Sequence, residues 1–442
     1  MRRIIDRRTN RQALSELPYG YSCSFCGAFL AGAVMKGCGI ITHCSPGCNF
    51  SLNITQLGAS GRFSKPVNFA STLLTEKDVI FGGGGSLYDS LLRFADNFDI
   101  DFEMVITGCS AETIGDNISE ISSRAFEKTG KPVLTVNAGG YKGNTVDGYN
   151  MALKSIAEQL VIDEMPRVDK SVNLIGIIPV HDLFWRGNIN EMTRLIQSIG
   201  ATVNSVLVGE GMTLADIRRL PSASLNVVVS ESVGIEAAAV ISERFGMETV
   251  ICDEGYPVGT VSSSKWLERV GKALNVSTEI INSAIVAETN SVLGSVANYI
   301  SALNDVILKQ RYFILADSFY ALGIFSYLTG ELGMTPEVIA VSTCNDRTLE
   351  KIGELCDRFS VNPVIAIDPD NNDIEKLLDE TEPTLFIGRG EDIQIARKKG
   401  VPLLGLTPTN LHRIQLYPLP LTGFNGGLVI LDEIFREVMN VR

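Results

Sequence analysis

The chain has 442 residues, of which 45% are hydrophobic and 20% are charged, and its formal net charge is −13. The length predicts about three domains, and the composition is typical of a folded protein rather than a disordered one. The acidic balance argues against nucleic acid as the main partner, because phosphate binding needs a basic surface. The apolar runs are too short for a membrane span, and no signal-peptide pattern follows the basic start, so we expect no membrane partner and a cytoplasmic location.

Apolar runs alternate with helical patterns along the whole chain, which favours βαβ units. The fold class expected from this pattern is α/β, with mostly parallel sheets flanked by helices. Strands are expected at Lys77–Phe81, Glu103–Thr107, Pro132–Asn137, Asn173–Pro179, Thr202–Val208, Asn226–Val229, Glu248–Cys252, Tyr312–Ala316, Val338–Val341, Val364–Ile367, Thr384–Ile387 and Pro402–Leu406.

The expected units form three groups. A polar stretch at Asp163–Lys170 is interpreted as the first boundary, and the third group begins with Tyr312–Ala316 after a long helical stretch. We predict an N-terminal domain over residues 1–170, a second over 171–300 and a third over 301–442. Residues 20–65 are rich in Gly, Cys, Ser and Pro and show little periodicity. Such a long irregular segment is typical of a functional region.

A run of four glycines, Gly82 to Gly85, is expected to lie between a strand and a helix. Backbone N–H groups at such a junction can hold a phosphate. The run does not fit the G-x-x-x-x-G-K-[ST] pattern of phosphate-binding loops. A tight turn or close packing therefore explains it better than nucleotide binding.

The cysteines carry the strongest chemical signal. Five of the nine lie between Cys23 and Cys48, and Cys109 follows the apolar run Glu103–Thr107. Disulfides are rare in a reducing compartment, so this crowding favours metal. Thiolates on glycine-containing loops suit an iron–sulfur cluster. Zinc is the alternative, with Cys23-x-x-Cys26 as the close pair. Buried, unreactive thiols are the interpretation for Cys252, Cys344 and Cys356.

Three segments resemble the β-type subunits of the nitrogenase component 1 superfamily. Cys23 has Gly four positions later, followed by Ala; the second segment, His43 to Cys48, resembles the H-G-x-x-G-C loop; and the third, Cys109 to Asn117, resembles C-x-x-E-x-I-G-D-D. Cys23 and Cys48 are 25 positions apart, as in β-type chains. The likeness covers nearly the whole chain and implies three Rossmann-like domains.

The resemblance implies that Cys23, Cys48 and Cys109 hold half of an iron–sulfur cluster. Three cysteines do not complete a four-cysteine site, so an α-type catalytic partner would supply the remaining ligands. The implied cofactor is an eight-iron, P-cluster-like cluster shared with that partner in an α2β2 heterotetramer. An ATP-hydrolysing iron–sulfur reductase would deliver electrons to it. No catalytic residue is expected in this chain.

Several positions depart from the family pattern. Cys44 replaces a Gly and Asn117 replaces an Asp, while Cys26 and Cys38 are additional cysteines. Asn144 stands where β subunits of true nitrogenases have a Ser that can ligate the oxidised cluster. Ser230 and Thr407 stand near the places where α-type chains have the Cys and His that hold the catalytic cofactor. His412 is interpreted as structural.

These observations leave several functions open. The leading hypothesis is the electron-relay subunit of a nitrogenase-like reductase, most like methylthio-alkane reductase. The alternatives are a β subunit of a dinitrogen-reducing nitrogenase and a non-catalytic scaffold for metal-cofactor assembly. Glu112 and Ser110 are candidates for groups that surround Cys109, although Glu112 is equally interpreted as a helix N-terminal charge. The substrate is not readable from this chain, because it would bind in the partner.

Overall fold

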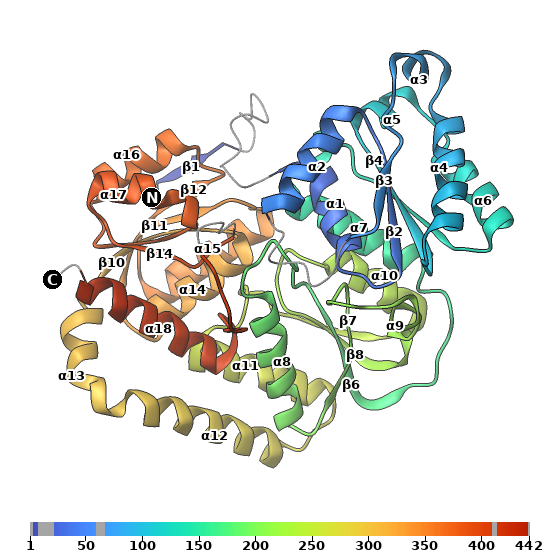
Figure 1. Ribbon diagram of the computed structural model, residues 1–442. Coiled ribbons are helices and arrows are strands. Elements are labelled where there is room, and N and C mark those ends of the chain that lie inside the picture. Colours follow the sequence, from blue (N-terminus) through green and yellow to red (C-terminus); the bar gives the residue numbers. More distant parts are fainter. Residues whose placement is uncertain (1–2, 8–21, 59–66, 409–412, 441–442) are drawn as a thin grey trace.

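The computed structural model describes residues 3–7, 22–58, 67–408 and 413–440, and shows three parallel β-sheets covered by helices (Figure 1). Every strand pairing in these sheets is parallel. One continuous cluster of buried apolar side chains extends through all three units, so they share a core. In the described part of the chain, no helix combines the length and apolarity that a membrane span needs.

The first sheet belongs to the cysteine-bearing unit, with strand order β3-β2-β4-β5. Alternating side chains of β2 and β4 face opposite layers. Ile40 and Met104 join the core with Phe29 and Tyr149, whereas Ile41 joins the core under α4 and α6. The elements are α1 (Ser24–Ala33), β2 (Cys38–His43), α2 (Pro46–Gly58), β3 (Phe69–Ser71), α3 (Glu76–Phe81), α4 (Gly84–Asn97), β4 (Phe102–Thr107), α5 (Cys109–Ile114), α6 (Ile118–Thr129), β5 (Val133–Asn137), η2 (Gly140–Lys142) and α7 (Thr145–Gln159).

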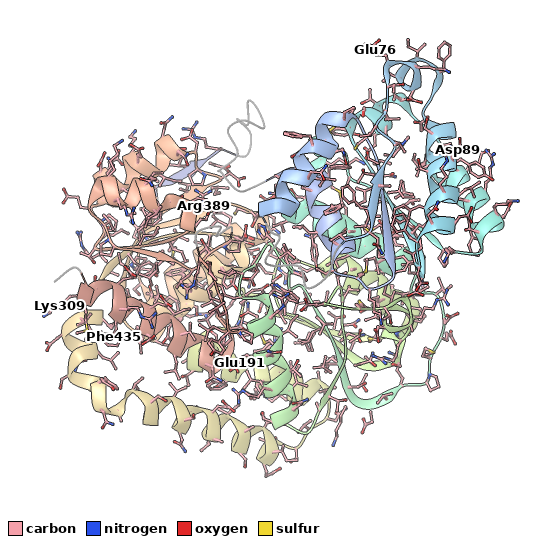
Figure 2. The ribbon with its side chains drawn as sticks, viewed as in Figure 1. Glu76, Asp89, Glu191, Lys309, Arg389 and Phe435 are labelled. Carbon is pink, nitrogen blue, oxygen red and sulfur yellow. The ribbon has the colours of Figure 1, made fainter. Side chains whose placement is uncertain are left out.

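The second sheet has strand order β7-β6-β8-β9. Its elements are β6 (Val168–Ile175), α8 (Trp185–Ser198), β7 (Thr202–Val206), α9 (Leu214–Arg218), η3 (Leu220–Ser222), β8 (Ala223–Val228), α10 (Ile235–Phe245), β9 (Glu248–Ile251) and α11 (Gly259–Ala273). Glu191 of α8 accepts hydrogen bonds from the backbone N and Nδ2 of Asn425, at 3.2 and 2.9 Å. This carboxylate, labelled in Figure 2, therefore ties the second unit to the C-terminal helix.

The third sheet has six strands in the order β1-β12-β11-β10-β13-β14. Its elements and the helices leading to it are β1 (Ile4–Asp6), α12 (Thr278–Val296), η4 (Ala297–Tyr299), α13 (Ile300–Ala302), η5 (Leu303–Ile307), β10 (Arg311–Ala316), α14 (Ser318–Gly330), β11 (Thr335–Val341), α15 (Asp346–Phe359), β12 (Val364–Ile367), α16 (Asn371–Thr381), β13 (Leu385–Gly388), η6 (Gly390–Asp392), α17 (Ile393–Lys399), β14 (Leu403–Gly405) and α18 (Gly423–Asn440).

Strand β1 differs from the expected domain organisation. Ile4, Ile5 and Asp6 pair with Ile365, Ala366 and Ile367, so the first strand of the chain lies in the third sheet. The assignment of residues 4–6 to the N-terminal domain is therefore wrong for this strand. Three residues carry too short a pattern to show which sheet they join. The boundaries near residues 170 and 300 stay a prediction.

Two further expectations are corrected. Lys77–Phe81 is helix α3 and not a strand, because Thr75 and Asp78 form a capping box at its start, and Ile80 and Phe81 are exposed. The segment 20–65 is not irregular over its described residues, since it forms α1, β2 and α2. The other predicted strands are confirmed, with ends shifted by a few residues.

Candidate iron–sulfur site

Cys109 lies at the carboxyl end of β4, the edge at which parallel sheets place their sites. Gly108 is the N-cap of α5, and Cys109 is its first residue. The backbone N–H of Gly140 donates a hydrogen bond to the Cys109 Sγ at 3.0 Å. Such a bond stabilises negative charge on sulfur, as ligation of a metal requires.

Cys23 is brought to the same edge by the packing of α1 against α7. It is the N-cap of α1 and forms an isolated bridge with Asn144, the N-cap of α7. A Cβ on Gly27 would lie only 1.8 Å from the Thr145 carbonyl oxygen, and one on Gly148 would lie 1.8 Å from that of Ser24. Glycine at both positions therefore lets the two helices touch, which explains the glycine four residues after Cys23.

Gly140 lies between the two thiols. A Cβ built on Gly140 would be 3.1 Å from the Cys23 Sγ and 3.4 Å from the Cys109 Sγ. Cys23 and Cys109, which are 86 positions apart in the chain, thus border one small space in which a side chain at 140 would compete with a ligand. Gly140 was not predicted from the sequence; the Gly139–Gly140 pair after β5 was the available signal.

Cys26 supports Cys23. A hydrogen bond from Cys26 is the main reason why the pKa of the Cys23 thiol is lowered to about 6, although burial acts in the opposite direction. The same bond and burial raise the pKa of Cys26. The hydroxyl of Ser22 donates to the Cys26 Sγ at 3.0 Å. Cys23 is therefore the thiolate of the pair, and Cys26 the donor that stabilises it.

Cys48 lies in the first turn of α2, and its Sγ accepts from the Ser45 hydroxyl at 3.7 Å. Ser51, one turn further on, hydrogen-bonds to Cys26. Residues three apart share a helix face, so Cys48 stands on the side of α2 that faces Cys26. Among the residues the structure describes, no group of three or more His, Cys, Asp or Glu side chains is close enough to hold a metal. Cys23 and Cys109 converge at Gly140, whereas Cys48 is connected to them only through the contact of its helix with Cys26.

His43 and Asp116 connect the second and third motifs. His43 Nε2 lies 2.9 Å from Asp116 Oδ2, and its Nδ1 lies 3.0 Å from the Thr72 hydroxyl. Burial lowers the pKa of His43 despite the nearby carboxylate. The neutral imidazole therefore donates from Nε2 to Asp116 and accepts at Nδ1 from Thr72.

The glycine run is explained by the same carboxylate. Gly83 N donates to both oxygens of Asp116 at 3.0 and 3.1 Å, and a Cβ on Gly83 would lie 2.5 Å from a Leu74 methyl carbon. Gly82 adopts a left-handed backbone with φ of 90°. The run thus serves close packing around an internal carboxylate rather than an external phosphate.

Glu112 fixes the loop that approaches Cys109. Its carboxylate accepts from the Thr107 hydroxyl at 2.8 Å, the Gly139 N at 2.8 Å and the Tyr141 hydroxyl at 2.6 Å, and pairs with Lys142 at 2.7 Å. Although burial opposes it, these donors hold the pKa of Glu112 below its usual range. The contacts join α5 to the Gly139–Lys142 loop. The Ser110 Oγ is buried without a hydrogen-bond partner among the described residues.

Asn144 is a helix cap in this structure. Its Oδ1 accepts from Val146 N at 2.9 Å and Asp147 N at 3.2 Å, and the Asp147 carboxylate accepts from Asn144 N at 2.8 Å. This capping box starts α7 beside Cys23. The residue that replaces the family's Ser therefore stands next to a predicted ligand, with its oxygen committed to the backbone.

The remaining cysteines are less suited to ligation. Cys38, Cys252 and Cys356 are buried, and burial raises the pKa of the Cys38 and Cys252 thiols. Cys44 is also buried with a raised pKa, and its Sγ lies 3.7 Å from the Ser71 hydroxyl. Cys344 was expected to be buried but is partly exposed, and its thiol donates to the Asn345 carbonyl oxygen.

Ser230 and Thr407, which the resemblance places near the cofactor positions of α-type chains, are both hydrogen-bonded within this chain. Ser230 is buried, and its Oγ accepts from Val233 N at 2.8 Å. Thr407 is buried, and its hydroxyl donates to the Leu315 carbonyl oxygen at 2.9 Å. His181 and Asp317 are also buried, and His181 Nε2 lies 3.0 Å from Asp317 Oδ2. His412, which the sequence suggested to be structural, lies outside the described residues.

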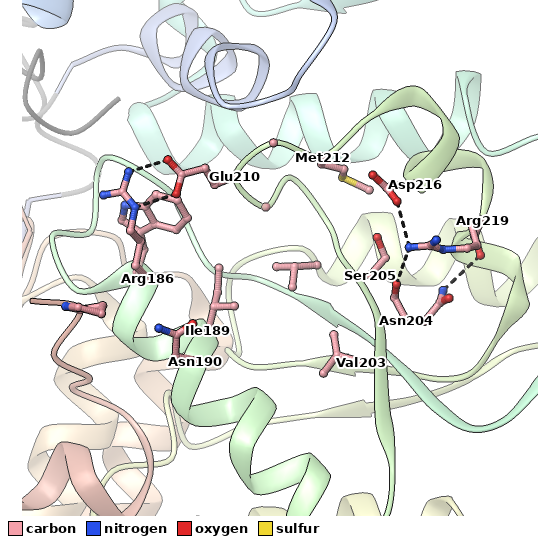
Figure 3. A pocket seen from close by; sticks show the side chains of 15 residues that line it. Arg186, Ile189, Asn190, Val203, Asn204, Ser205, Glu210, Met212, Asp216 and Arg219 are labelled. Carbon is pink, nitrogen blue, oxygen red and sulfur yellow. Dashed lines mark hydrogen bonds and ion pairs between the residues drawn. The ribbon is translucent and has the colours of Figure 1, made fainter. Parts of the chain in front are cut away.

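A cavity of about 480 Å³ lies elsewhere, beside edge strand β7 (Figure 3). Its charged lining groups pair with one another: Arg186 forms two bonds to Glu210, and Arg219 bonds to Asp216. Because these charges are already neutralised, the cavity is a weaker candidate for a functional site than the cysteine edge.

The chain is similar to known proteins along almost its whole length. The family pattern described as "Nitrogenase component 1 type Oxidoreductase" matches residues 23–439. The nitrogenase molybdenum-iron protein beta chain of Frankia alni is 26% identical, covering 97% of this chain and 84% of that protein. One of the subunits of the light-independent protochlorophyllide reductase of Chlorobium phaeobacteroides is 22% identical, covering 80% of this chain and 67% of that protein. A solved structure of nitrogenase Cp1 at pH 6.5 has the same fold, with a TM-score of 0.83 at 18% identity over 98% of this chain and 95% of that one.

Proposed function

This chain belongs to the nitrogenase component 1 type oxidoreductases, and we propose that it is the β-type, electron-relay subunit of a nitrogenase-like reductase. The observation that carries the proposal is the convergence of Cys23 and Cys109 at Gly140. Cys48 is added because it lies in the first turn of α2, the helix whose Ser51 hydrogen-bonds to Cys26. We propose these three thiols as ligands to an iron–sulfur cluster that supplies one-electron redox chemistry when bound. Asn144 lies beside Cys23, with which it forms an isolated β-bridge.

The donor set fits such a cluster. A thiol with a lowered pKa, a sulfur that already accepts a backbone N–H, and a glycine in place of a side chain all suit thiolate ligation. The set is incomplete for one chain, which supports a site shared with a second subunit. We propose that an α-type catalytic chain supplies the other ligands and that the cluster is eight-iron and P-cluster-like.

The chemistry on the substrate is assigned to that partner. Ser230 and Thr407 are buried and hydrogen-bonded within this chain, and neither supplies a thiolate or imidazole to a cofactor. The proposed complex is a cytoplasmic α2β2 heterotetramer, and an ATP-hydrolysing iron–sulfur reductase is its electron donor.

For the substrate class, we propose a small organic sulfide, as in methylthio-alkane reductases. Asn144 in place of the Ser of dinitrogen-reducing enzymes supports this choice over a dinitrogen-reducing β subunit. The full set of three cysteines supports an electron-relay role over an assembly scaffold. The dinitrogen reductase remains the second candidate, because the nitrogenase beta chain of Frankia alni matches almost the whole chain.

The test is to purify the chain anaerobically with its α-type partner. The complex is expected to contain roughly eight iron atoms and matching acid-labile sulfide per αβ pair at the shared site, beyond those of any cofactor held by the partner. Zinc without iron or sulfide would refute the proposed cofactor. ATP-dependent release of methane from dimethyl sulfide would support the substrate class, whereas ammonia formation from dinitrogen alone would favour the second candidate.

A further inference from the structure

Cys26 is a cysteine that the proposed cluster does not use. It is 3% exposed and lies in the first turn of α1, three residues after Cys23. Residues three apart share a helix face, and the side chains of the two cysteines are hydrogen-bonded to each other. Alanine would satisfy the packing at this position, so the contact between the two sulfur atoms is the property that distinguishes Cys26.

The two thiols differ in their access to solvent. Cys23 is partly exposed, whereas Cys26 is buried and the Ser22 hydroxyl donates to its Sγ at 3.0 Å. A Cys-x-x-Cys pair at the start of a helix, with an accessible first sulfur, is typical of a reversible thiol–disulfide site. The accessible sulfur exchanges with another molecule, and the buried sulfur then completes the internal disulfide.

The backbone allows this bond to close. Side chains three residues apart in a helix have Cβ atoms about 5–6 Å apart, and a disulfide needs about 3.5–4.5 Å. Cys23 is the N-cap of α1 and has an extended backbone, with φ of −77° and ψ of 172°. A rotation at Cys23 therefore closes the gap at the edge of the helix. It strains the bonds from Cys26 N and Gly27 N to the Cys23 carbonyl oxygen, at 3.1 and 3.4 Å, and leaves the later turns intact.

Closing the bond has a direct effect on the candidate site. The Cys23 Sγ lies beside Gly140, in the small space that it shares with Cys109. A sulfur that is bonded to Cys26 carries no thiolate charge, and the thiolate is the form that ligates a metal. A chain with this disulfide therefore lacks one of its three proposed ligands.

We propose that Cys23 and Cys26 form a reversible disulfide in the cluster-free chain, and that its reduction releases Cys23 for ligation. In the cytoplasm proposed for this complex, disulfides are typically transient and redox-sensing. The pair is thus a modification site that delays cluster assembly under oxidising conditions. The inference rests on the proposed function in one respect, the role of Cys23 as a ligand; the disulfide itself requires only the two thiols.

A small disulfide of the glutathione class is the oxidant. The Cys23 thiolate attacks one sulfur of this molecule, a mixed disulfide forms, and the first small thiolate leaves. The Cys26 sulfur then attacks the Cys23 sulfur, which closes the internal bond and releases the second small thiolate. The protein pair loses two electrons, the small disulfide gains them, and the two cysteine protons end on the two released thiols.

The test equilibrates the iron-free full chain in a buffer of reduced and oxidised glutathione, followed by alkylation of free thiols and mass spectrometry of the peptides. An internal disulfide depends on the square of the reduced glutathione concentration, whereas a mixed disulfide depends on its first power. Diluting the whole buffer about tenfold should therefore raise the ratio of disulfide to dithiol at Cys23 and Cys26 by about tenfold.

Two variants separate the internal bond from other thiol chemistry. In Cys26→Ala, Cys23 should hold a glutathione molecule, and the dilution should leave its amount unchanged. Cys44→Ala removes another buried cysteine of the first unit and is the matched control, which should behave as the wild type does. A bond from Cys23 to Cys109, or a glutathione that stays on Cys23 in the wild type, would overturn the proposal.

The initial rate of iron incorporation, with the α-type partner present, is measured on the same samples. It should be lower for the oxidised wild-type chain than for the same chain after reduction by dithiothreitol. Normal iron content without any internal disulfide would overturn this inference and leave the proposed cluster intact. An internal disulfide with equal rates before and after reduction would overturn the role in assembly and contradict Cys23 as a ligand.

Discussion

At the scale of single residues, the cysteine edge depends on donors that surround the thiols. Glu112 holds the Gly139–Lys142 loop, and Gly140 of that loop donates to Cys109. Two interpretations of Glu112 were open from the sequence, a helix N-terminal charge and a group near Cys109. The structure shows both, because Glu112 lies in the first turn of α5 and binds the loop that contacts Cys109. The residues that the sequence did not reveal are the small ones, because a glycine beside a thiol has meaning only in three dimensions.

The ligand assignment predicts different outcomes for two groups of cysteines. Cys48→Ala or Cys109→Ala should remove the shared cluster, roughly eight iron atoms per αβ pair, and weaken pairing with the α-type chain. Cys356→Ala, at a buried position, should keep the iron and lose only about 1–3 kcal/mol of stability. Iron and sulfide analysis beside thermal unfolding checks both. Full iron content in the Cys48→Ala complex would contradict the assignment.

The complex should retain its cluster when Cys26 or Cys44 is replaced by Ala. Cys26→Ala removes the hydrogen bond that lowers the pKa of Cys23, so its cluster is expected to assemble more slowly at low pH. Iron uptake by the apo complex between pH 6 and 8 measures this. Loss of the cluster from Cys26→Ala at every pH would instead identify Cys26 as a ligand.

Asn144→Ser tests the link between this cap and the cluster. Serine is as good an N-cap as asparagine, so the iron-free variant should keep its stability. In the loaded complex, a serine alkoxide favours oxidised iron more than a neutral amide does, so the most oxidised couple should shift to lower potential. Redox titration followed by EPR checks this. An unchanged couple would show that position 144 does not contact the cluster.

Glu103 should make folding pH-dependent. Both of its oxygens are buried without a hydrogen-bond partner among the described residues. Burial raises the pKa of Glu103 to about 8, against the attraction of Lys131, from 4.5 for an unperturbed glutamate. Between these values the folded chain keeps a proton that the unfolded chain has lost. Stability should therefore fall as pH rises from about 4.5 to 8, by up to roughly 1.4 kcal/mol per pH unit.

Glu103→Gln should remove this contribution, because its amide is neutral at every pH. The difference in unfolding free energy between variant and wild type should grow from pH 5 to pH 7.5 in favour of the variant. Urea unfolding of the full chain measures it, and all other titrating groups cancel in the difference. A constant difference across this range would mean that Glu103 is not held protonated.

At the scale of elements, the contact of α1 with α7 positions Cys23. A Cβ on Gly27 would overlap the Thr145 carbonyl oxygen, so Gly27→Ala must push the helices apart. We expect a loss of about 1–3 kcal/mol together with lower iron content. Gly85→Ala, in α4, meets no atom within 4 Å and should leave both unchanged. Equal stability and iron content for the two variants would contradict this role of the contact.

The elements also show where sequence patterns are informative. Most of the buried parallel strands were predicted, because an apolar run bounded by turn residues marks such a strand. The run Lys77–Phe81 was predicted as a strand from its apolar end, but it forms the exposed helix α3, where the Thr75–Asp78 cap outweighs strand propensity. Strand β2 was missed because Cys38, Gly39, Thr42 and His43 interrupt its apolar pattern, although all of its residues are buried.

At the scale of the whole molecule, the three-unit α/β organisation followed from the alternating pattern, but the return of β1 to the third sheet did not. The pairing of β1 with β12 joins residues about 360 positions apart, and no local signal encodes such a contact. The candidate site shows the same difference between what the local sequence predicts and what only the fold reveals. Motif spacing predicted Cys23, Cys48 and Cys109 as ligands, and this assignment stays a proposal. The packing that brings Cys23 close to Cys109, and the hydrogen bonds from Gly83 to Asp116, became visible only in the fold.

The most direct test of the central claim is the location of iron in the assembled complex. Anomalous scattering at the iron edge, from crystals of the chain with its α-type partner, should place a cluster at the subunit interface, bonded to the sulfur atoms of Cys23, Cys48 and Cys109. Iron bonded to other residues, or a signal at the zinc edge in its place, would contradict the account.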